Sequence, residues 1–141
     1  MSWSTQATAR TRAHPDEVWR IWTDVAGWSR WDPEIESSRL DGPFVEGRRG
    51  VLKPRGGPET PFVLIEVDRP RGFSNRSRLP LASLTFIHTL REEAGETVIE
   101  HRVEMDGPLT FLFSSLLGTG LARSLPTSVE RLARFAEGAA D

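Results

Sequence analysis

The chain of 141 residues fits one folded domain, 1–141, rather than two, and is long enough to bury a core. It has no cysteine, which excludes disulfides and thiolate chemistry, and its formal charge of −2 offers no basic surface for nucleic acid. The N-terminus lacks the basic and apolar regions of a signal peptide, and the longest apolar stretch, 109–125, is interrupted before it could span a membrane. We therefore expect a soluble cytoplasmic protein with no integral membrane segment and no nucleic-acid partner.

The first part of the chain predicts one strand followed by two short helices. Residues 3–13 alternate loosely between small and polar types, which is typical of a strand. Pro15 suits the first turn of a helix, and apolar residues then recur at helical spacing until Gly27 breaks the run. A second helix is expected at 28–31, and Pro33 stops it.

The middle of the chain predicts an antiparallel meander, because short apolar runs alternate with glycine and proline turns. After Pro108, apolar residues recur at three- and four-residue steps as far as Ala136, which predicts one long helix with an apolar face. Pro126 lies inside that helix and is expected to kink it one turn upstream. The six strands of the meander are expected at residues 35–40, 48–53, 60–67, 73–79, 82–90 and 97–105.

The last hairpin can be paired residue by residue. Centred on the turn at 93–96, the pairing places His88 opposite His101 on a mostly apolar face and leaves the charged residues on the other face. A slip of one residue would mix the two faces, so the alternation itself predicts the register. By the same reasoning, with Glu66 outside, the inward-facing residues of the two preceding strands are Val63, Ile65, Val67, Phe73, Asn75, Ser77 and Leu79.

One strand, two helices, six strands and one long helix is the order of the helix-grip fold. Residues 14–19, HPDEVW, and 28–33, WSRWDP, resemble the opening of the START-like (SRPBCC) polyketide cyclase/dehydrase and lipid-transport family. The resemblance covers nearly the whole chain. Shorter similarities to the same family occur at residues 47–50, 66–70, 86–88 and 107–109.

The resemblance implies an α+β fold in which a curved seven-stranded antiparallel sheet wraps around a long C-terminal helix, with two short helices after the first strand. It also implies a ligand pocket between the sheet and that helix. Members of the family include cyclases, lipid carriers and plant hormone receptors, so the fold does not select an activity. Our first hypothesis is binding of a hydrophobic or aromatic small molecule, which could extend to its transport or conversion, with no cofactor.

The second hypothesis is a cyclase or dehydratase that uses His88 and His101 as catalytic residues. A buried histidine can act as a general acid or base near neutral pH, and Asn75 and Ser77 could donate to a developing enolate. The alternative is structural: the two histidines could hydrogen-bond each other or a water. The chain has no tyrosine, and its arginines in 73–79 face outward, which departs from related cyclases and weakens the enzyme hypothesis. No carboxylate shares the inner face with the histidines, so no metal site is predicted.

The predicted ligand-binding residues combine the inner face of the sheet with one side of the long helix. Trp28 and Trp31 could form the mouth of the pocket, although packing of the helical opening is the simpler interpretation. Asp24 and Asp32 are expected to cap helices or form turns rather than to act as paired catalytic carboxylates. The full predicted set is Trp28, Trp31, Phe73, Asn75, Ser77, Leu79, Phe86, His88, Ile99, His101, Val103, Phe113, Leu117 and Leu121.

The third hypothesis is a protein-interaction module or homodimer. Residues 111–117 are apolar almost all round the predicted helix, which is typical of a helix buried on several sides, a lid or a dimer face. Gly118 and Gly120 follow directly. They could form a hinge, or they could allow close packing against the sheet, and we favour packing.

Overall fold

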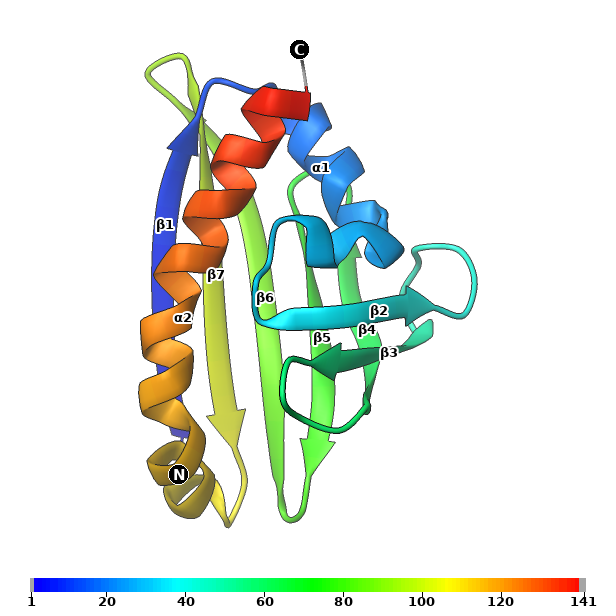
Figure 1. Cartoon of the computed structure of the whole chain (residues 1–141), viewed down its shortest axis with the longest axis vertical. Helices are drawn as coiled ribbons and strands as arrows, with labels where there is room; N and C mark the ends of the chain where they lie inside the picture. The colour runs from blue at the N-terminus through cyan, green and yellow to red at the C-terminus, as the bar shows by residue number, and fades with distance from the viewer. Residues whose placement is uncertain (1, 140–141) are drawn as a thin grey trace.

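The protein is a curled antiparallel sheet that carries one long helix on its concave side (Figure 1). A computed structural model describes residues 2–139. Among these residues no helix is long and apolar enough to cross a membrane. The elements in chain order are β1 (Ser2–Thr11), α1 (Pro15–Thr23), the 3₁₀ helix η1 (Val25–Arg30), β2 (Ile35–Leu40), β3 (Arg49–Pro54), β4 (Thr60–Asp68), β5 (Gly72–Leu79), β6 (Ala82–Glu93), β7 (Glu96–Asp106) and α2 (Thr110–Ala139).

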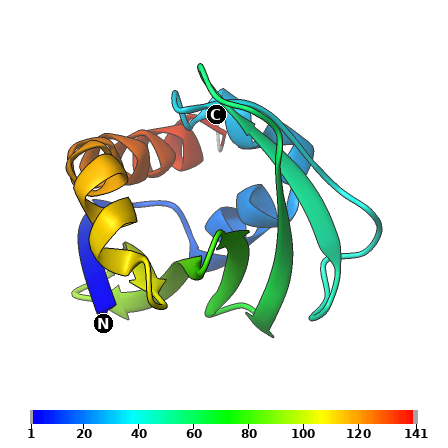
Figure 2. The same cartoon turned by 90° about the horizontal axis from the view of Figure 1, so that it is seen from below.

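The seven strands form one sheet in the order β1-β7-β6-β5-β4-β3-β2, with every neighbouring pair antiparallel. The meander from β2 to β7 follows chain order, and only β1 joins out of sequence, beside β7. Figure 2 shows that the sheet is curled, with α2 along one side of its concave face and α1 and η1 over one end. The predicted helix-grip fold is therefore confirmed.

The predicted register of the last hairpin is also confirmed. His88 pairs with His101 and Phe86 pairs with Val103, and the pairing runs back to Glu93 opposite Glu96. The connecting residues Ala94 and Gly95 both have positive φ, 53° and 80°. Two successive left-handed residues make the tight turn whose twist matches that of the flanking strands.

The inward positions predicted for β4 are wrong at Val63 and Ile65. The register of β4 against β5 shifts between Leu64 and Glu66, so Ile65 is the extra residue of a bulge. Phe62 and Leu64 consequently enter the core, with exposed fractions of 3% and 0%. Beyond the bulge the parity returns to the predicted one, and Val67 pairs with Phe73 and packs against the core.

The helical opening differs from its prediction in where its two helices meet. The His14 side chain caps α1 by accepting the Asp16 N–H at Nδ1, 3.1 Å away. The first helix ends at Thr23 rather than at Gly27, and the second begins at Val25 as a 3₁₀ helix. Gly27 lies inside that second helix, where a Cβ would collide with the Asp24 carboxylate. Gly27 is therefore closely packed inside the second helix rather than a helix stop, and any side chain there would displace the Asp24 carboxylate.

The two halves of α2 differ in their surroundings. From Leu125 onward its predicted apolar stripe is buried against β1 and β7, and Val129 and Leu132 have no exposed surface. The helix continues through Pro126 as one unbroken α-helix. Before Leu125 the helix meets the sheet at Gly118, where a Cβ would lie 3.1 Å from the Trp3 indole. This contact confirms the packing interpretation of Gly118.

Candidate functional site

Two histidines face each other on the concave side of the sheet. His88 lies on β6 and His101 directly opposite on β7, and their ring centroids are 4.7 Å apart in an edge-to-face arrangement. Both are buried, with exposed fractions of 9% and 4%. The sequence placed them together correctly because strand alternation and the turn at 93–96 determine which residues are opposite.

Burial keeps both imidazoles neutral. Desolvation lowers the pKa of His88 to about 4, although a hydrogen bond between its Nδ1 and the Phe73 carbonyl, 3.2 Å away, acts in the opposite direction. Desolvation, with a smaller contribution from repulsion by His88, holds the pKa of His101 well below its usual value. With Nδ1–H donating to Phe73, the Nε2 atom of His88 is left as an acceptor. At neutral pH neither ring therefore carries a charge, and their lowered pKa values make both rings weak bases.

Tryptophans from the helical opening enclose the histidine pair. Trp22 on α1 contacts both rings, with centroids 5.7 Å from His88 and 6.0 Å from His101. Trp31, just after η1, lies 5.9 Å from His101. Phe73 stacks on His88 at 4.0 Å with its ring nearly parallel. The concave face is thus filled with aromatic rings at the end covered by α1.

Trp22 was absent from the predicted site residues. Its helical spacing with Val18 and Ile21 marked it as buried, but only the docking of α1 onto the sheet brings it to the histidines. Trp28, which was predicted, stacks instead on Phe62 and Phe73 at 5.8 and 6.1 Å. Its Nε1 donates to the Trp22 carbonyl at 2.9 Å. Because Trp28 and Trp31 are 4% and 6% exposed, they fill the interior rather than form an open rim.

Three polar atoms in this cluster have no hydrogen-bond partner among residues 2–139. They are the indole Nε1 of Trp22, the indole Nε1 of Trp31 and the Nε2 of His101. A buried polar group without a partner costs about 1–3 kcal/mol, so most such groups in proteins are paired. Their concentration around one imidazole makes this end of the concave face unusual.

The other polar residues predicted for the inner face are also there. Asn75 and Ser77 on β5 are 5% and 6% exposed and pair with Phe86 and Leu84 on β6. Arg76 and Arg78 are exposed on the opposite face, as predicted, and the Arg76 Nε donates to the Thr85 hydroxyl at 3.1 Å. The inner face therefore carries an amide, a hydroxyl and two neutral imidazoles within an apolar surface.

The concave face is less covered at the end away from α1. Val103 and Met105 on β7 have no exposed surface, whereas their β6 partners Phe86 and Leu84 keep part of theirs. Ile99, nearer the 93–96 turn, is fully buried opposite the buried Leu90. The partly exposed apolar residues predicted for ligand contact are Leu79 and Phe86 on the sheet and Phe113, Leu117 and Leu121 on α2, and Leu84, which was outside the predicted set, is partly exposed as well. These residues form a second, apolar region next to the aromatic and imidazole cluster.

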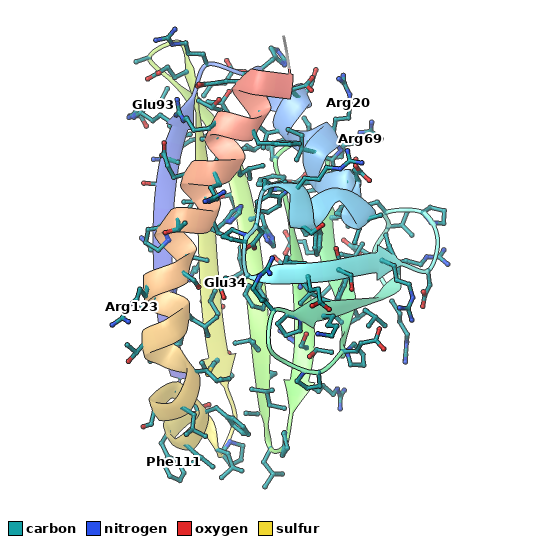
Figure 3. The ribbon with its side chains drawn as sticks, in the orientation of Figure 1. Arg20, Glu34, Arg69, Glu93, Phe111 and Arg123 are labelled. Carbon is teal, nitrogen blue, oxygen red and sulfur yellow. The ribbon has the colours of Figure 1, made fainter. Side chains whose placement is uncertain are left out.

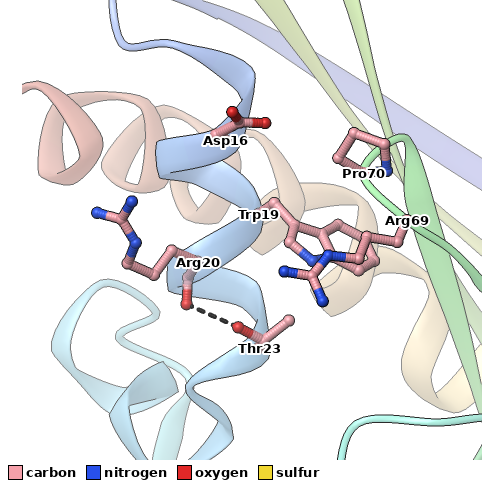
Figure 4. Close-up of a pocket in the computed structure, with 6 residues that line it drawn as sticks. All are labelled: Asp16, Trp19, Arg20, Thr23, Arg69 and Pro70. Carbon is pink, nitrogen blue, oxygen red and sulfur yellow. Dashed lines mark hydrogen bonds between the residues drawn. The ribbon is translucent and has the colours of Figure 1, made fainter.

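Two surface hollows lie elsewhere. One of about 570 Å³ lies between α1 and the turn after β4, with Trp19 in its lining and Arg20 and Arg69 beside it (Figure 4). Another of about 400 Å³ adjoins the loop before β3 and is lined by residues 41 and 46–49. Neither contains a residue predicted to bind ligand.

The start of α2 is the most apolar exposed part of the described surface. Phe111 projects from the end of the molecule in Figure 3 and is 57% exposed, and Leu116 is 68% exposed. Leu81, in the adjoining β5–β6 turn, is equally exposed, and its carbonyl accepts the Leu109 N–H at 3.0 Å. The prediction that this segment is apolar all round holds, but it is open rather than buried on several sides.

The two aspartates have structural surroundings. The Asp32 carboxylate accepts the Glu34 N–H at 3.0 Å in a local turn, as predicted, and burial raises its pKa. Asp24 occupies the junction between α1 and η1, although its side chain makes no capping hydrogen bond. No group of three or more potential metal ligands occurs among the described residues.

Comparison with known proteins points to one family. A sequence profile described as polyketide cyclase / dehydrase and lipid transport matches residues 2–137. The fold is similar to the Zhui aromatase/cyclase from Streptomyces sp. R1128, with a TM-score of 0.81, 14% identity and coverage of 100% of this chain and 97% of that one. No curated protein matches the sequence.

Two further solved structures share the fold. The protein TTHA0849 from Thermus thermophilus gives a TM-score of 0.77 at 14% identity and covers 99% of this chain and 100% of its own. The di-domain ARO/CYC StfQ from the steffimycin biosynthetic pathway gives 0.77 at 13% identity, covering 99% of this chain and 52% of that one.

Proposed function

Because this chain belongs to the polyketide cyclase / dehydrase and lipid transport family, we propose that it binds a hydrophobic or aromatic small molecule on the concave face of its sheet, beside α2. The observation that carries the proposal is the row of partly exposed apolar side chains there. Leu84 and Phe86 on β6 and Leu117 and Leu121 on α2 all keep exposed surface in a region where the fold curls inward.

Apolar burial supplies the driving force for such binding. Covering a large apolar side chain completely gains roughly 1.5–3 kcal/mol, and a ligand that covers several at once would gain a useful part of that from each. The neighbouring Asn75, Ser77 and histidines offer a small number of polar contacts. An apolar lining with a few polar groups is the usual composition of a small-molecule site.

Native mass spectrometry of the purified protein, alone and with a panel of hydrophobic and aromatic metabolites, tests the proposal. We expect a bound mass that is lost on denaturation. Leu117→Ser should weaken binding about tenfold, because it removes apolar contact worth roughly 1.5 kcal/mol. Leu116→Ser is the matched control, since Leu116 is the preceding residue of α2 and is 68% exposed. Equal affinity in the two variants would place the ligand elsewhere.

A second candidate function is acid–base catalysis on the bound molecule, and the meeting of two imidazoles on the concave face favours it. A neutral imidazole of His88 or His101 could take a proton from a carbon between two carbonyls. The resulting enolate would form a carbon–carbon bond to another carbonyl of the same chain, and the imidazolium would return the proton to the new alkoxide. The sum of these steps is an aldol cyclisation without a cofactor.

Conversion of a poly-β-ketone thioester, followed by mass spectrometry and chromatography, tests this candidate. Replacement of both histidines by phenylalanine should abolish turnover while the far-ultraviolet circular dichroism stays native. Turnover at the wild-type rate in the double variant would exclude the histidines as catalytic residues.

A further inference from the structure

The large exposed apolar side chains of the described surface are gathered at one end of the molecule. Apart from Val45, those of residues 2–139 are Leu81 in the β5–β6 turn and Phe111, Leu112, Leu116 and Leu117 at the start of α2. The two segments adjoin, because the Leu81 carbonyl accepts the Leu109 N–H. In Figure 3, Phe111 marks this end and Glu93 the opposite one. We call Leu81, Phe111, Leu112 and Leu116 the apolar tip.

The backbone of the tip disfavours the residue found at position 81. Leu81 has a φ of 54°, in the left-handed region that glycine and asparagine adopt more easily than leucine does. Burial of the side chain does not offset this cost, since Leu81 is 68% exposed. Because leucine here stabilises neither the turn nor the core, its apolar side chain points to a contact outside the isolated fold.

The apolar tip belongs to two stretches of sequence without charge. Residues 79–90 and 107–122 contain no Asp, Glu, Lys or Arg. The charged residues nearest to the tip in the chain are Arg78, Asp106 and Arg123, all exposed, so basic side chains outnumber acidic ones at its border. An arginine can lay its stem along an apolar surface and hold its guanidinium against phosphate. An uncharged apolar end bordered by arginine therefore matches the layers of a phospholipid bilayer, hydrocarbon and then phosphate.

The size and place of the tip favour a bilayer over a second protein. A stable protein interface takes about 20–30 residues on each side, with a polar rim around its apolar centre. The tip offers four exposed apolar side chains, and it lies at the end of the long axis of the molecule rather than on a broad face (Figures 1 and 3). A fluid bilayer needs no matching shape, and the strength of its binding scales with the apolar area that enters it.

We propose that the apolar tip inserts into the surface of a phospholipid bilayer and holds the protein there reversibly. Leu112 and Leu116 are one helical turn apart on α2, so they enter on the same side of the helix, with Phe111 and Leu81 beside them. The contact lies on the outer surface and does not depend on which molecule the concave face binds. Docking in this way also brings the less covered end of the concave face to the membrane.

Flotation with phosphatidylcholine vesicles tests the proposal. We expect the wild-type protein to float with the vesicles at millimolar lipid, with little dependence on salt, because the contact is mainly apolar. Leu81→Asn and Phe111→Ser should each lower the partition coefficient about tenfold, the effect of one large apolar side chain. Both variants should fold, because asparagine tolerates the left-handed region and Phe111 is 57% exposed.

Val45→Ser is the matched control. Val45 is 46% exposed but lies in the loop before β3, outside the apolar tip, so this variant should float like the wild type. A wild-type protein that stays out of the vesicle fraction would overturn the proposal, and so would equal partition coefficients for all three variants. A protein that sediments as a dimer and leaves the vesicles bare would show that a second copy covers the tip instead.

Tryptophan fluorescence shows where the bound protein touches the lipid. Trp3 is the only tryptophan outside residues 19–31, and it packs against Gly118 in the first half of α2. Phosphatidylcholine brominated on its acyl chains quenches an indole that lies close to it. We expect partial quenching of the wild-type protein on such vesicles and none in Trp3→Phe, because the other four indoles are buried away from the tip. Bound protein whose quenching is absent, or persists in Trp3→Phe, would place the contact elsewhere and overturn the proposal.

Discussion

His88 and His101 form a cross-strand pair whose rings meet edge to face, 4.7 Å apart, in the most aromatic part of the interior. Burial disfavours a charge on either ring, and a proton on one ring would in addition repel a proton on the other. The pair therefore links three properties of the protein: its stability in acid, the shape of the concave face and the chemistry available to a ligand.

The buried histidines should make the protein sensitive to mild acid. The unfolded chain protonates His88 near 6.5, whereas the folded protein resists protonation down to about 4. Below pH 6.5 the unfolded state therefore binds more protons, and stability falls as the pH falls toward 4. For His88 alone the loss at pH 4 is about 3 kcal/mol, an order-of-magnitude value.

Urea unfolding at several pH values between 7 and 4 measures this effect. The difference in unfolding free energy between the wild type and His88→Phe at each pH isolates the contribution of the histidine, because the carboxylates titrate in both proteins. The loss of unfolding free energy per pH unit should be clearly smaller in His88→Phe than in the wild type. A His88→Phe variant with the wild-type pH dependence would contradict a buried neutral His88.

The two glycines in the first half of α2 should respond differently to alanine. At Gly118 a Cβ would lie 3.1 and 3.2 Å from two atoms of the Trp3 indole, whereas at Gly120 it would meet nothing within 4 Å. Gly120→Ala should raise the free energy of unfolding by about 0.5–1 kcal/mol through helix propensity. Gly118→Ala should gain less or lose stability, because Trp3 must move. Thermal unfolding of the two variants side by side tests this, and equal effects would indicate that α2 and β1 do not pack closely here.

The two ends of α2 should differ in the cost of losing a leucine. Leu132 has no exposed surface and belongs to the core, so Leu132→Ala should cost about 2–5 kcal/mol. Leu116 is 68% exposed, and Leu116→Ala should change stability by less than about 0.5 kcal/mol. Denaturant titrations measure both. A large loss at Leu116 would mean that this residue is covered in solution.

The interaction hypothesis makes a separate prediction about that same segment. If residues 111–117 form a homodimer face, the sedimentation coefficient should rise with protein concentration, because exposed apolar patches of this kind commonly mark contact surfaces. Leu116→Glu should then give a monomer at every concentration. A wild-type protein that sediments as a monomer even at high concentration would exclude the homodimer.

Most of the sheet follows from local sequence patterns. In β6 and β7 a mostly apolar inner face, a more polar outer face and the tight turn at Ala94 and Gly95 favour one register, and the structure has it. The same parity put Asn75 and Ser77 inside and Arg76 outside, where they are found. These features depend on neighbours along the chain or across one hairpin, so the sequence is sufficient to predict them.

The β4 strand shows how such reasoning fails. Its bulge at Ile65 reverses the parity of the residues before it, so Phe62 and Leu64 replace Val63 and Ile65 in the core. Either set of residues is apolar enough to be buried, and the curvature of the whole sheet selects between them. That curvature is a property of seven strands together, not of the β4 sequence.

By itself, the sequence determined the order of the elements and the meeting of His88 with His101, because these follow from periodicity, turns and strand pairing, and its resemblance to a known family indicated the fold class. Only the tertiary structure decided which residues complete the site. Trp22 reaches the histidines because α1 docks over the end of the sheet, and Phe111 and Leu116 at the start of α2 stay exposed whereas Val129 and Leu132 in its second half are buried. Both outcomes depend on contacts between segments far apart in the chain. Local sequence patterns do not show how closely such segments approach one another in the folded protein.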